Sequence, residues 1–119
     1  GDGFKIIVSS YQDEQRKRFA IAQELGHLFL HMGYKTNAEI WEKQADKVPF
    51  QEKDPEKVRQ ANEFAAALLM PRYIFFLTLE AASDIAESGK RTIHMQAVAD
   101  FFNVSLSAAH TRAKDFGII

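Results

Sequence analysis

The sequence has 119 residues with a formal net charge of −1, and 46% of them are hydrophobic while 26% are charged. This balance is typical of one globular domain, and the near-zero charge predicts no general attraction to nucleic acids or membrane surfaces. The absence of cysteine excludes disulfides, thiolate metal sites and cysteine nucleophiles. No apolar run approaches the roughly 20 residues that span a bilayer. We therefore expect a single cytoplasmic domain over residues 1–119, either complete or part of a longer chain.

Most of the N-terminal half is expected to be helical. Residues 4–9 form a short β-branched run after a glycine, which predicts a strand. A long helix is predicted over 13–32, with Gly33 ending it. Residues 34–53 are expected to form a loop with a short helix or strand. Asp54 and Pro55 are typical of a helix start and predict a second long helix over 54–70.

Three further helices are expected in the C-terminal half. The first begins at Pro71 and runs to about residue 87, with Phe75 and Phe76 expected in the core. The second covers 93–102. Residues 103–105 predict a turn in which Ser105 caps the last helix, from 106 to about 116. The predicted class is an α+β domain dominated by about five helices, with a strand near the N-terminus and room for one hairpin elsewhere.

The helix predicted over 13–32 carries a polar stripe. Apolar side chains occupy nearly every direction around residues 19–30, which predicts burial on most sides. Gln23, His27 and His31 fall on one face at helical spacing, with Glu24 beside them. A buried polar stripe requires hydrogen bonds, water or a metal ion. One interpretation is therefore a hydrogen-bonded seam without chemistry, because short motifs often match by chance.

The other interpretation of the stripe is a metal site. In the H-E-x-x-H motif two histidines at i and i+4 bind one zinc ion, and the glutamate deprotonates zinc-bound water. The string from Gln23 to His27 retains every element except the first ligand. An amide oxygen binds zinc poorly compared with an imidazole. The shape of such a site can therefore survive while its zinc affinity falls steeply.

Three blocks of the sequence resemble the ImmA/IrrE family of small zinc metallopeptidases. Residues 18–31 are similar to the family's Arg-Phe-x-x-Ala-His-Glu-x-Gly-His-x-x-x-His stretch. Residues 61–71 are similar to its Ala-Asn-x-Phe-Ala-Ala-x-Leu-Leu-Met-Pro motif, and residues 102–105, with Ala108 and Arg112 following, to its C-terminal block. The resemblance covers most of residues 4–119. It implies a mainly helical, zincin-like α+β fold with a small β-sheet near the active helix.

The resemblance assigns roles to the stripe residue by residue. Glu24 matches the general base of the family. His27 matches the second zinc ligand, and His31 matches a further histidine that positions a ligand rather than binding the metal. Asn62 belongs to the second motif and is expected either to hydrogen-bond the stripe across the helix interface, in a similar positioning role, or to be exposed.

Two of the family's three metal-ligand positions lack a zinc-binding side chain. Gln23 stands where the first zinc histidine belongs. Val58 stands three residues before the Ala-Asn motif, where the resemblance places an acidic ligand. Catalytic zinc needs three protein ligands and an open position for water. We therefore expect zinc to bind weakly or not at all. Because two positions are changed, a naturally degenerate member is favoured over a single engineered substitution.

The resemblance also implies a partner, because the family acts on transcriptional repressors or regulators. The expected function is a peptidase domain with a degenerate metal site that acts on or binds a repressor-like regulator. One alternative is an active zinc metalloprotease, with Glu24 activating water and His27 holding the metal. Another is a DNA-binding helix-turn-helix over 95–116, with His110, Arg112 and Lys114 facing DNA. This segment lacks a strong basic cluster, so nucleic acid is the less favoured partner.

Overall fold

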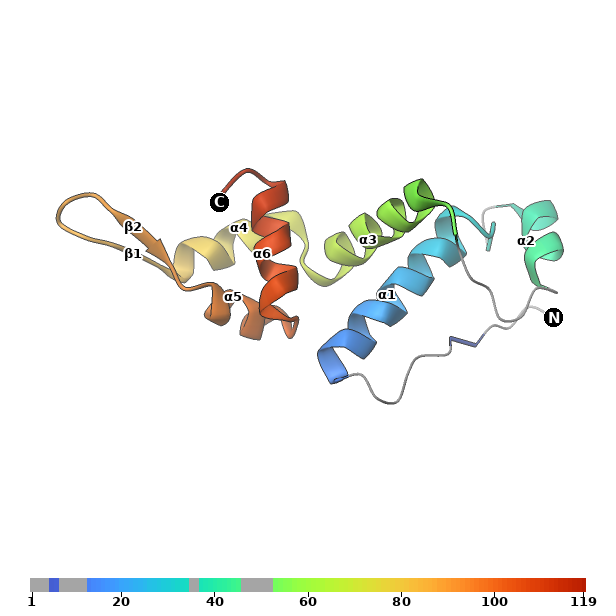
Figure 1. Cartoon of the computed structure of the whole chain (residues 1–119), viewed down its shortest axis with the longest axis horizontal. Coiled ribbons are helices and arrows are strands. Elements are labelled where there is room, and N and C mark those ends of the chain that lie inside the picture. The colour runs from blue at the N-terminus through green and yellow to red at the C-terminus, as the bar shows by residue number, and fades with distance from the viewer. Residues whose placement is uncertain (1–4, 7–12, 35–36, 46–52) are drawn as a thin grey trace.

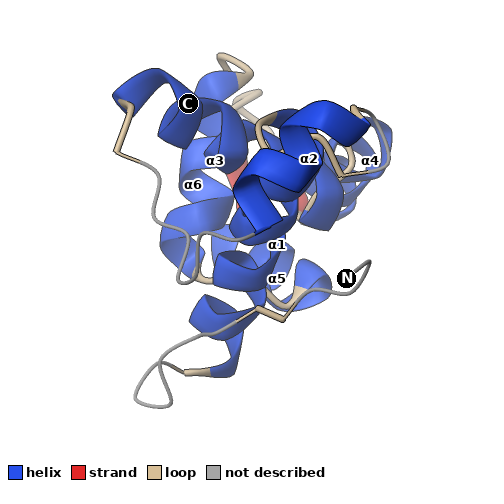
Figure 2. Cartoon of the chain, turned by 90° about the vertical axis from the view of Figure 1, so that its right-hand side faces the viewer, coloured by secondary structure: helices blue, strands red, loops and turns tan. Residues whose placement is uncertain are grey.

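The computed structural model describes residues 5–6, 13–34, 37–45 and 53–119. It is mostly helical with one small antiparallel sheet, so the mainly helical α+β class is confirmed (Figures 1 and 2). A short helix lies within the stretch expected to be mainly loop. The elements are α1 (Glu14–Leu30), α2 (Ala38–Ala45), α3 (Pro55–Leu69), α4 (Arg72–Ala81), β1 (Ser83–Ile85), β2 (Arg91–Ile93), α5 (Met95–Phe102) and α6 (Leu106–Asp115).

Local capping signals explain where the long helices begin. The Asp13 carboxylate accepts a hydrogen bond of 2.8 Å from the backbone N–H of Arg16 and so caps α1. The Asp54 carboxylate accepts one of 3.0 Å from the N–H of Glu56, with Pro55 at the first helical position, as expected. No single helix in the described part of the chain is both long and apolar enough to cross a bilayer, although α3 and α4 reach that length as a pair bent by 59°.

The antiparallel hairpin β1–β2 pairs Asp84 with Thr92. It shows that the helix predicted over 71–87 was wrong beyond Ala81. The Ser83 hydroxyl donates to the carbonyl of Leu79 and satisfies an acceptor at the end of α4. Gly89 then turns the chain with a φ of +86°, which a glycine adopts without strain. Pairing of β1 with β2 therefore takes the place of the last turn that was predicted for the helix.

The described sheet lies at the end of the molecule opposite α1 (Figure 1). We expected a small sheet beside the helix that carries the polar stripe, which is α1, and this hairpin does not lie there. The strand predicted over 4–9 lies outside the described residues, apart from Lys5 and Ile6, which are not in a strand.

Helices α1 and α3 pack closely, side by side and antiparallel (Figure 1). A Cβ placed on Gly26 would lie 3.1 Å from the Cα of Ala61 and 3.2 Å from the Cβ of Phe64. Ala61 and Ala65 of α3 are buried in this contact. Small side chains on both helices therefore let the backbones approach, which is what brings the polar stripe of α1 against α3.

Burial of α1 is less complete than its composition predicts. Ala22, Gly26, His27 and Leu28 are buried. Other apolar side chains stay largely accessible, and Leu30 is 53% exposed. The prediction of burial on most sides was therefore wrong for this helix, because α3 covers only one of its faces among the described elements.

Replacing Gly26 by alanine is expected to lower the free energy of unfolding by about 1–3 kcal/mol, because the added methyl group is forced against α3. The better helix propensity of alanine offsets up to about 1 kcal/mol of this loss. Urea unfolding followed by circular dichroism measures the change. The exposed Ser107→Ala is the control and should change stability by less than about 0.5 kcal/mol. A Gly26→Ala protein more stable than the wild type would contradict the close approach.

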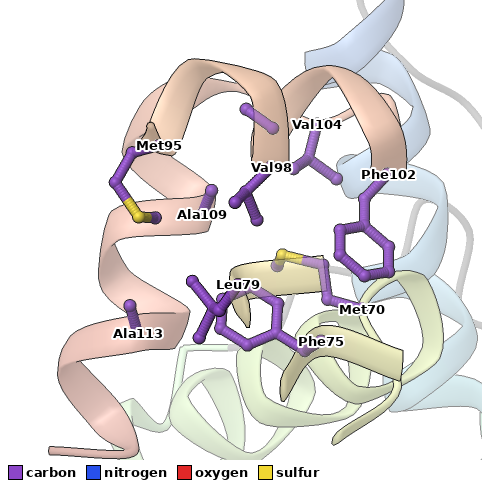
Figure 3. Packing of buried hydrophobic residues seen from close by; sticks show 10 residues of the cluster. Met70, Phe75, Leu79, Met95, Val98, Phe102, Val104, Ala109 and Ala113 are labelled. Atoms are coloured by element: carbon purple, nitrogen blue, oxygen red, sulfur yellow. The ribbon is translucent and has the colours of Figure 1, made fainter. Parts of the chain in front are cut away.

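A second core joins α4, α5 and α6 (Figure 3). The ring of Phe75 is fully buried, with its centroid 5.7 Å from that of Phe102 and 5.8 Å from that of Phe116. Phe76 is 38% exposed, although its ring contacts Phe116 and lies under the guanidinium of Arg72, so the expectation of a core position is correct for Phe75 and wrong for Phe76. The other buried members are Met70, Leu79, Met95, Val98, Ala99, Val104, Ala109 and Ala113.

The turn between α5 and α6 follows the expected pattern. Asn103 ends α5 in the left-handed conformation, with a φ of +54°, which asparagine tolerates better than most residues. The Ser105 hydroxyl accepts a hydrogen bond of 3.1 Å from the N–H of Ala108 and caps α6. Gly117 follows the last helix with a φ of +75°.

Candidate functional site

The polar stripe of α1 forms a chain of hydrogen bonds that reaches α3. The Nδ1 atoms of His27 and His31 lie 3.0 Å apart, and the Nε2 of His31 lies 2.7 Å from the Oε1 of Gln60. The amide N–H of Gln60 in turn donates to a carboxylate oxygen of Glu56 at 3.4 Å. His27 is buried at 6% exposure, so these hydrogen bonds satisfy a polar side chain in the interior.

The chain of hydrogen bonds selects the tautomer of His27. The Oε1 of Gln60 can only accept, so the Nε2 of His31 donates to it. A neutral His31 then accepts at Nδ1, and the proton between the two imidazoles belongs to the Nδ1 of His27. The basic nitrogen of a neutral His27 is therefore Nε2. Metal-binding histidines are commonly oriented this way, by donating the other ring N–H to an acceptor.

Gln23 and Asn62 meet across the same interface. The side-chain N–H of Gln23 donates to the Oδ1 of Asn62. The hydrogen bond that the sequence suggested for Asn62 is thus present, although Asn62 is also exposed. The resemblance leads us to expect a metal-binding imidazole at position 23. In this chain an amide occupies it and is bonded to the neighbouring helix.

Glu24 is half-buried beside the stripe, and this burial raises the pKa of its carboxyl group above 4.5. It makes no hydrogen bond or ion pair with the described residues. A carboxylate with a raised pKa accepts a proton more readily, which suits the general-base role expected for Glu24. That role still depends on a bound, activated water.

Replacing Glu24 by glutamine is expected to stabilise the protein at neutral pH relative to the wild type. Because the folded-state pKa is raised, the wild type loses stability as the pH rises from the unfolded pKa through the folded one. The gain should therefore be present at pH 7.5 and absent at pH 4, as measured by thermal unfolding. The exposed Glu80→Gln on α4 is the control. An equal gain at both pH values would show that the effect is not due to ionisation of Glu24.

Val58 lies on α3 four residues before Asn62 and therefore on the same face of that helix. Its side chain is 36% exposed and offers no ligand atom. Within the described ranges, no three His, Cys, Asp or Glu side chains come together as a metal site. Of the three positions at which the resemblance expects a zinc ligand, 23, 27 and 58, position 27 is the one that carries an imidazole or carboxylate. The described residues around His27 do not by themselves supply the three protein ligands that a catalytic zinc ion needs.

The comparison with protein families identifies the chain. A family model described as IrrE N-terminal-like domain matches residues 5–114. The chain belongs to this family. The resemblance to ImmA/IrrE metallopeptidases, stated above from three motifs, is thereby confirmed. No curated protein and no solved structure matches this IrrE-like domain.

Two arginines of the family motifs connect the α1–α3 helix pair of this IrrE-like domain to α5 and α6. The Nη1 of Arg18 donates to the carbonyl oxygens of Phe102 and Asn103, both at 2.8 Å, at the end of α5. The Nε of Arg112 donates to the carbonyl of Met70 at 3.1 Å. Sequence reasoning missed both contacts, and it also missed the part played by Gln60.

The residues suggested for DNA contact are not equivalent. His110 and Lys114 are exposed on α6. Arg112 is partly buried, its guanidinium carbon lies 4.4 Å from the ring centroid of Phe116, and burial lowers its pKa. A side chain held in this way is used for packing α6 onto the end of α3, which removes one of the three expected DNA contacts.

Proposed function

We propose that this IrrE-like domain binds a repressor-like transcription regulator without cutting it. The observation that supports the proposal is that Gln23 and Val58 stand at two of the three positions where the resemblance expects zinc ligands, a histidine and an acidic residue. Zinc-dependent hydrolysis of a peptide bond needs these ligands to hold the zinc ion, which lowers the pKa of a bound water. Recognition of a protein partner does not need them.

The surroundings of Gln23 support a site that is no longer built for metal. Its amide is bonded to Asn62, and the stripe continues through His31 to Gln60. These hydrogen bonds connect α1 to α3 through protein side chains alone. Glu24 and His27 remain in the family positions, which supports descent from a peptidase site whose shape is kept.

Binding and cutting can be separated in one experiment. The purified protein, dialysed after exposure to zinc, is analysed by inductively coupled plasma mass spectrometry for bound metal. It is then mixed with the repressor-like regulator encoded nearest to its gene, and the mixture is followed by isothermal titration calorimetry and gel electrophoresis. We expect well under one zinc ion per chain, a measurable complex and no cleavage. Stoichiometric zinc together with zinc-dependent cleavage would overturn the proposal and establish an active metalloprotease.

The position of Arg112 favours a protein partner over DNA. Fluorescence anisotropy with a labelled duplex at 50 and 200 mM salt tests the alternative. A DNA-binding module with several phosphate contacts would bind at low salt and lose affinity by orders of magnitude at high salt. We expect no saturable binding at either concentration.

A further inference from the structure

A cleft of about 920 Å³ lies between α1, α3 and α6. Its walls are formed by one face of each helix, over residues 15–23, 59–70 and 104–115. At 1.5 Å per residue, the walls on α1 and α3 are about 12 and 16 Å long. An extended peptide of about four or five residues has this length. The volume is also within the range of about 300–1,000 Å³ that is usual for ligand sites.

The amide pair Gln23–Asn62 lies on the wall of this cleft. One hydrogen bond joins the two amides. Whichever amide donates in that bond, the carbonyl oxygen of the donor amide and the N–H groups of the acceptor amide remain available to a third group. These atoms form no further hydrogen bond with the described residues. A side-by-side acceptor and donor complements the N–H and C=O groups of a peptide backbone.

The charges along the cleft indicate what side chain the peptide carries. Arg59 is neutralised by ion pairs with Glu56 and Glu63. Arg112 donates to the carbonyl of Met70 and interacts electrostatically with Asp115, which also lines the cleft. The side chain of Arg16, at the α1 end, has no ion pair with any described residue. A carboxylate on the occupant would form a charge-assisted hydrogen bond with this guanidinium.

We propose that the cleft binds an extended peptide segment, with the Gln23–Asn62 amide pair holding one backbone peptide group and Arg16 pairing with an acidic side chain. That this segment belongs to the regulator rests on the proposed function above. In this arrangement Gln23 binds the peptide backbone at the position where the resemblance expects a histidine that binds zinc. The small side chains of Ala66 and Ala67 leave the cleft open on the α3 side.

A phage-displayed library of random dodecapeptides is the probe. Peptides are selected on the intact protein and counter-selected on Ala67→Trp, in which the exposed cleft position is filled by an indole. Affinity of the enriched peptides, carrying fluorescein, is measured by anisotropy. We expect sequences with an acidic residue, bound about 10–100 times more weakly by Asn62→Leu and by Gln23→Leu, because each substitution removes one of the two backbone hydrogen bonds and leaves a peptide N–H or C=O unpaired.

A matched control removes an amide elsewhere. Gln96 is exposed on α5 outside the cleft, so Gln96→Leu should bind the peptides as the wild type does. Arg16→Glu should reject the acidic peptides, while its unfolding temperature shows whether the fold is kept. Enrichment of no peptide, or equal binding by all of these variants, would overturn the inference.

The intact regulator distinguishes this inference from the proposed function. If the regulator binds the wild type and Ala67→Trp equally, the cleft is not its site and the inference fails while the proposed function stands. If the regulator does not bind at all but selected peptides bind the cleft, the proposed function fails and the cleft remains a peptide site. If Ala67→Trp binds neither the regulator nor the selected peptides, the result supports both the proposed function and the peptide site in the cleft.

Discussion

The double variant Gln23→His with Val58→Glu is expected to bind zinc at least about a thousandfold more tightly than the wild type. Four-ligand zinc sites contribute about 10–16 kcal/mol, or roughly 3 kcal/mol per ligand, so two restored ligands are sufficient for such a gain. Two histidines at i and i+4 would face one ion, as in H-E-x-x-H. Position 58 is on the same face of α3 as Asn62, which already contacts position 23.

The remaining part of the site favours this outcome. His27 is buried, and its Nδ1 proton is directed to His31, so its Nε2 is the nitrogen that a metal would use. Gln60 holds His31 in place through a hydrogen bond of 2.7 Å. The ligand that the family pattern retains is therefore already oriented, and the substitutions supply only the groups that are missing.

Competition with a chromophoric zinc chelator measures the affinities. Gln23→His alone should recover part of the gain, and His27→Ala in the double variant should remove it. Cleavage of the regulator by the double variant, with none by the wild type, would show that the two positions separate binding from cutting. A double variant with no tighter zinc binding would mean that position 58 is not the third ligand position.

Phe75→Ala is expected to lower the free energy of unfolding by about 3–5 kcal/mol. The ring is fully buried between Phe102 and Phe116, and its removal leaves a cavity at the centre of the second core (Figure 3). Native domains have only about 5–15 kcal/mol of stability in total. The variant should therefore unfold at a much lower urea concentration than the wild type.

Phe101 provides a matched control for Phe75. It lies on the neighbouring helix α5 and is 65% exposed, so Phe101→Ala removes the same atoms from a largely hydrated position. Its loss of stability should be below about 1 kcal/mol. Equal effects of the two substitutions would contradict the core position of Phe75. Urea midpoints at unchanged slope give both values.

The sequence by itself determined where several helices begin and which residues share the stripe. Asp54 with Pro55, and Ser105, mark helix starts because capping acts within three residues along the chain. The spacing of Gln23, His27 and His31 determines that they share a face of α1, since helix geometry is local. The family membership rests on the same kind of information, namely which residue types stand at which spacing.

Only the tertiary structure decided what these side chains contact. Gln60 bonds His31, and Asn62 bonds Gln23, because α1 and α3 approach at Gly26 in one particular register. The hairpin that replaces the end of the predicted helix over 71–87 depends on pairing between residues six to ten apart. Such contacts are set by how whole elements pack against one another, so the pattern within one segment does not determine them.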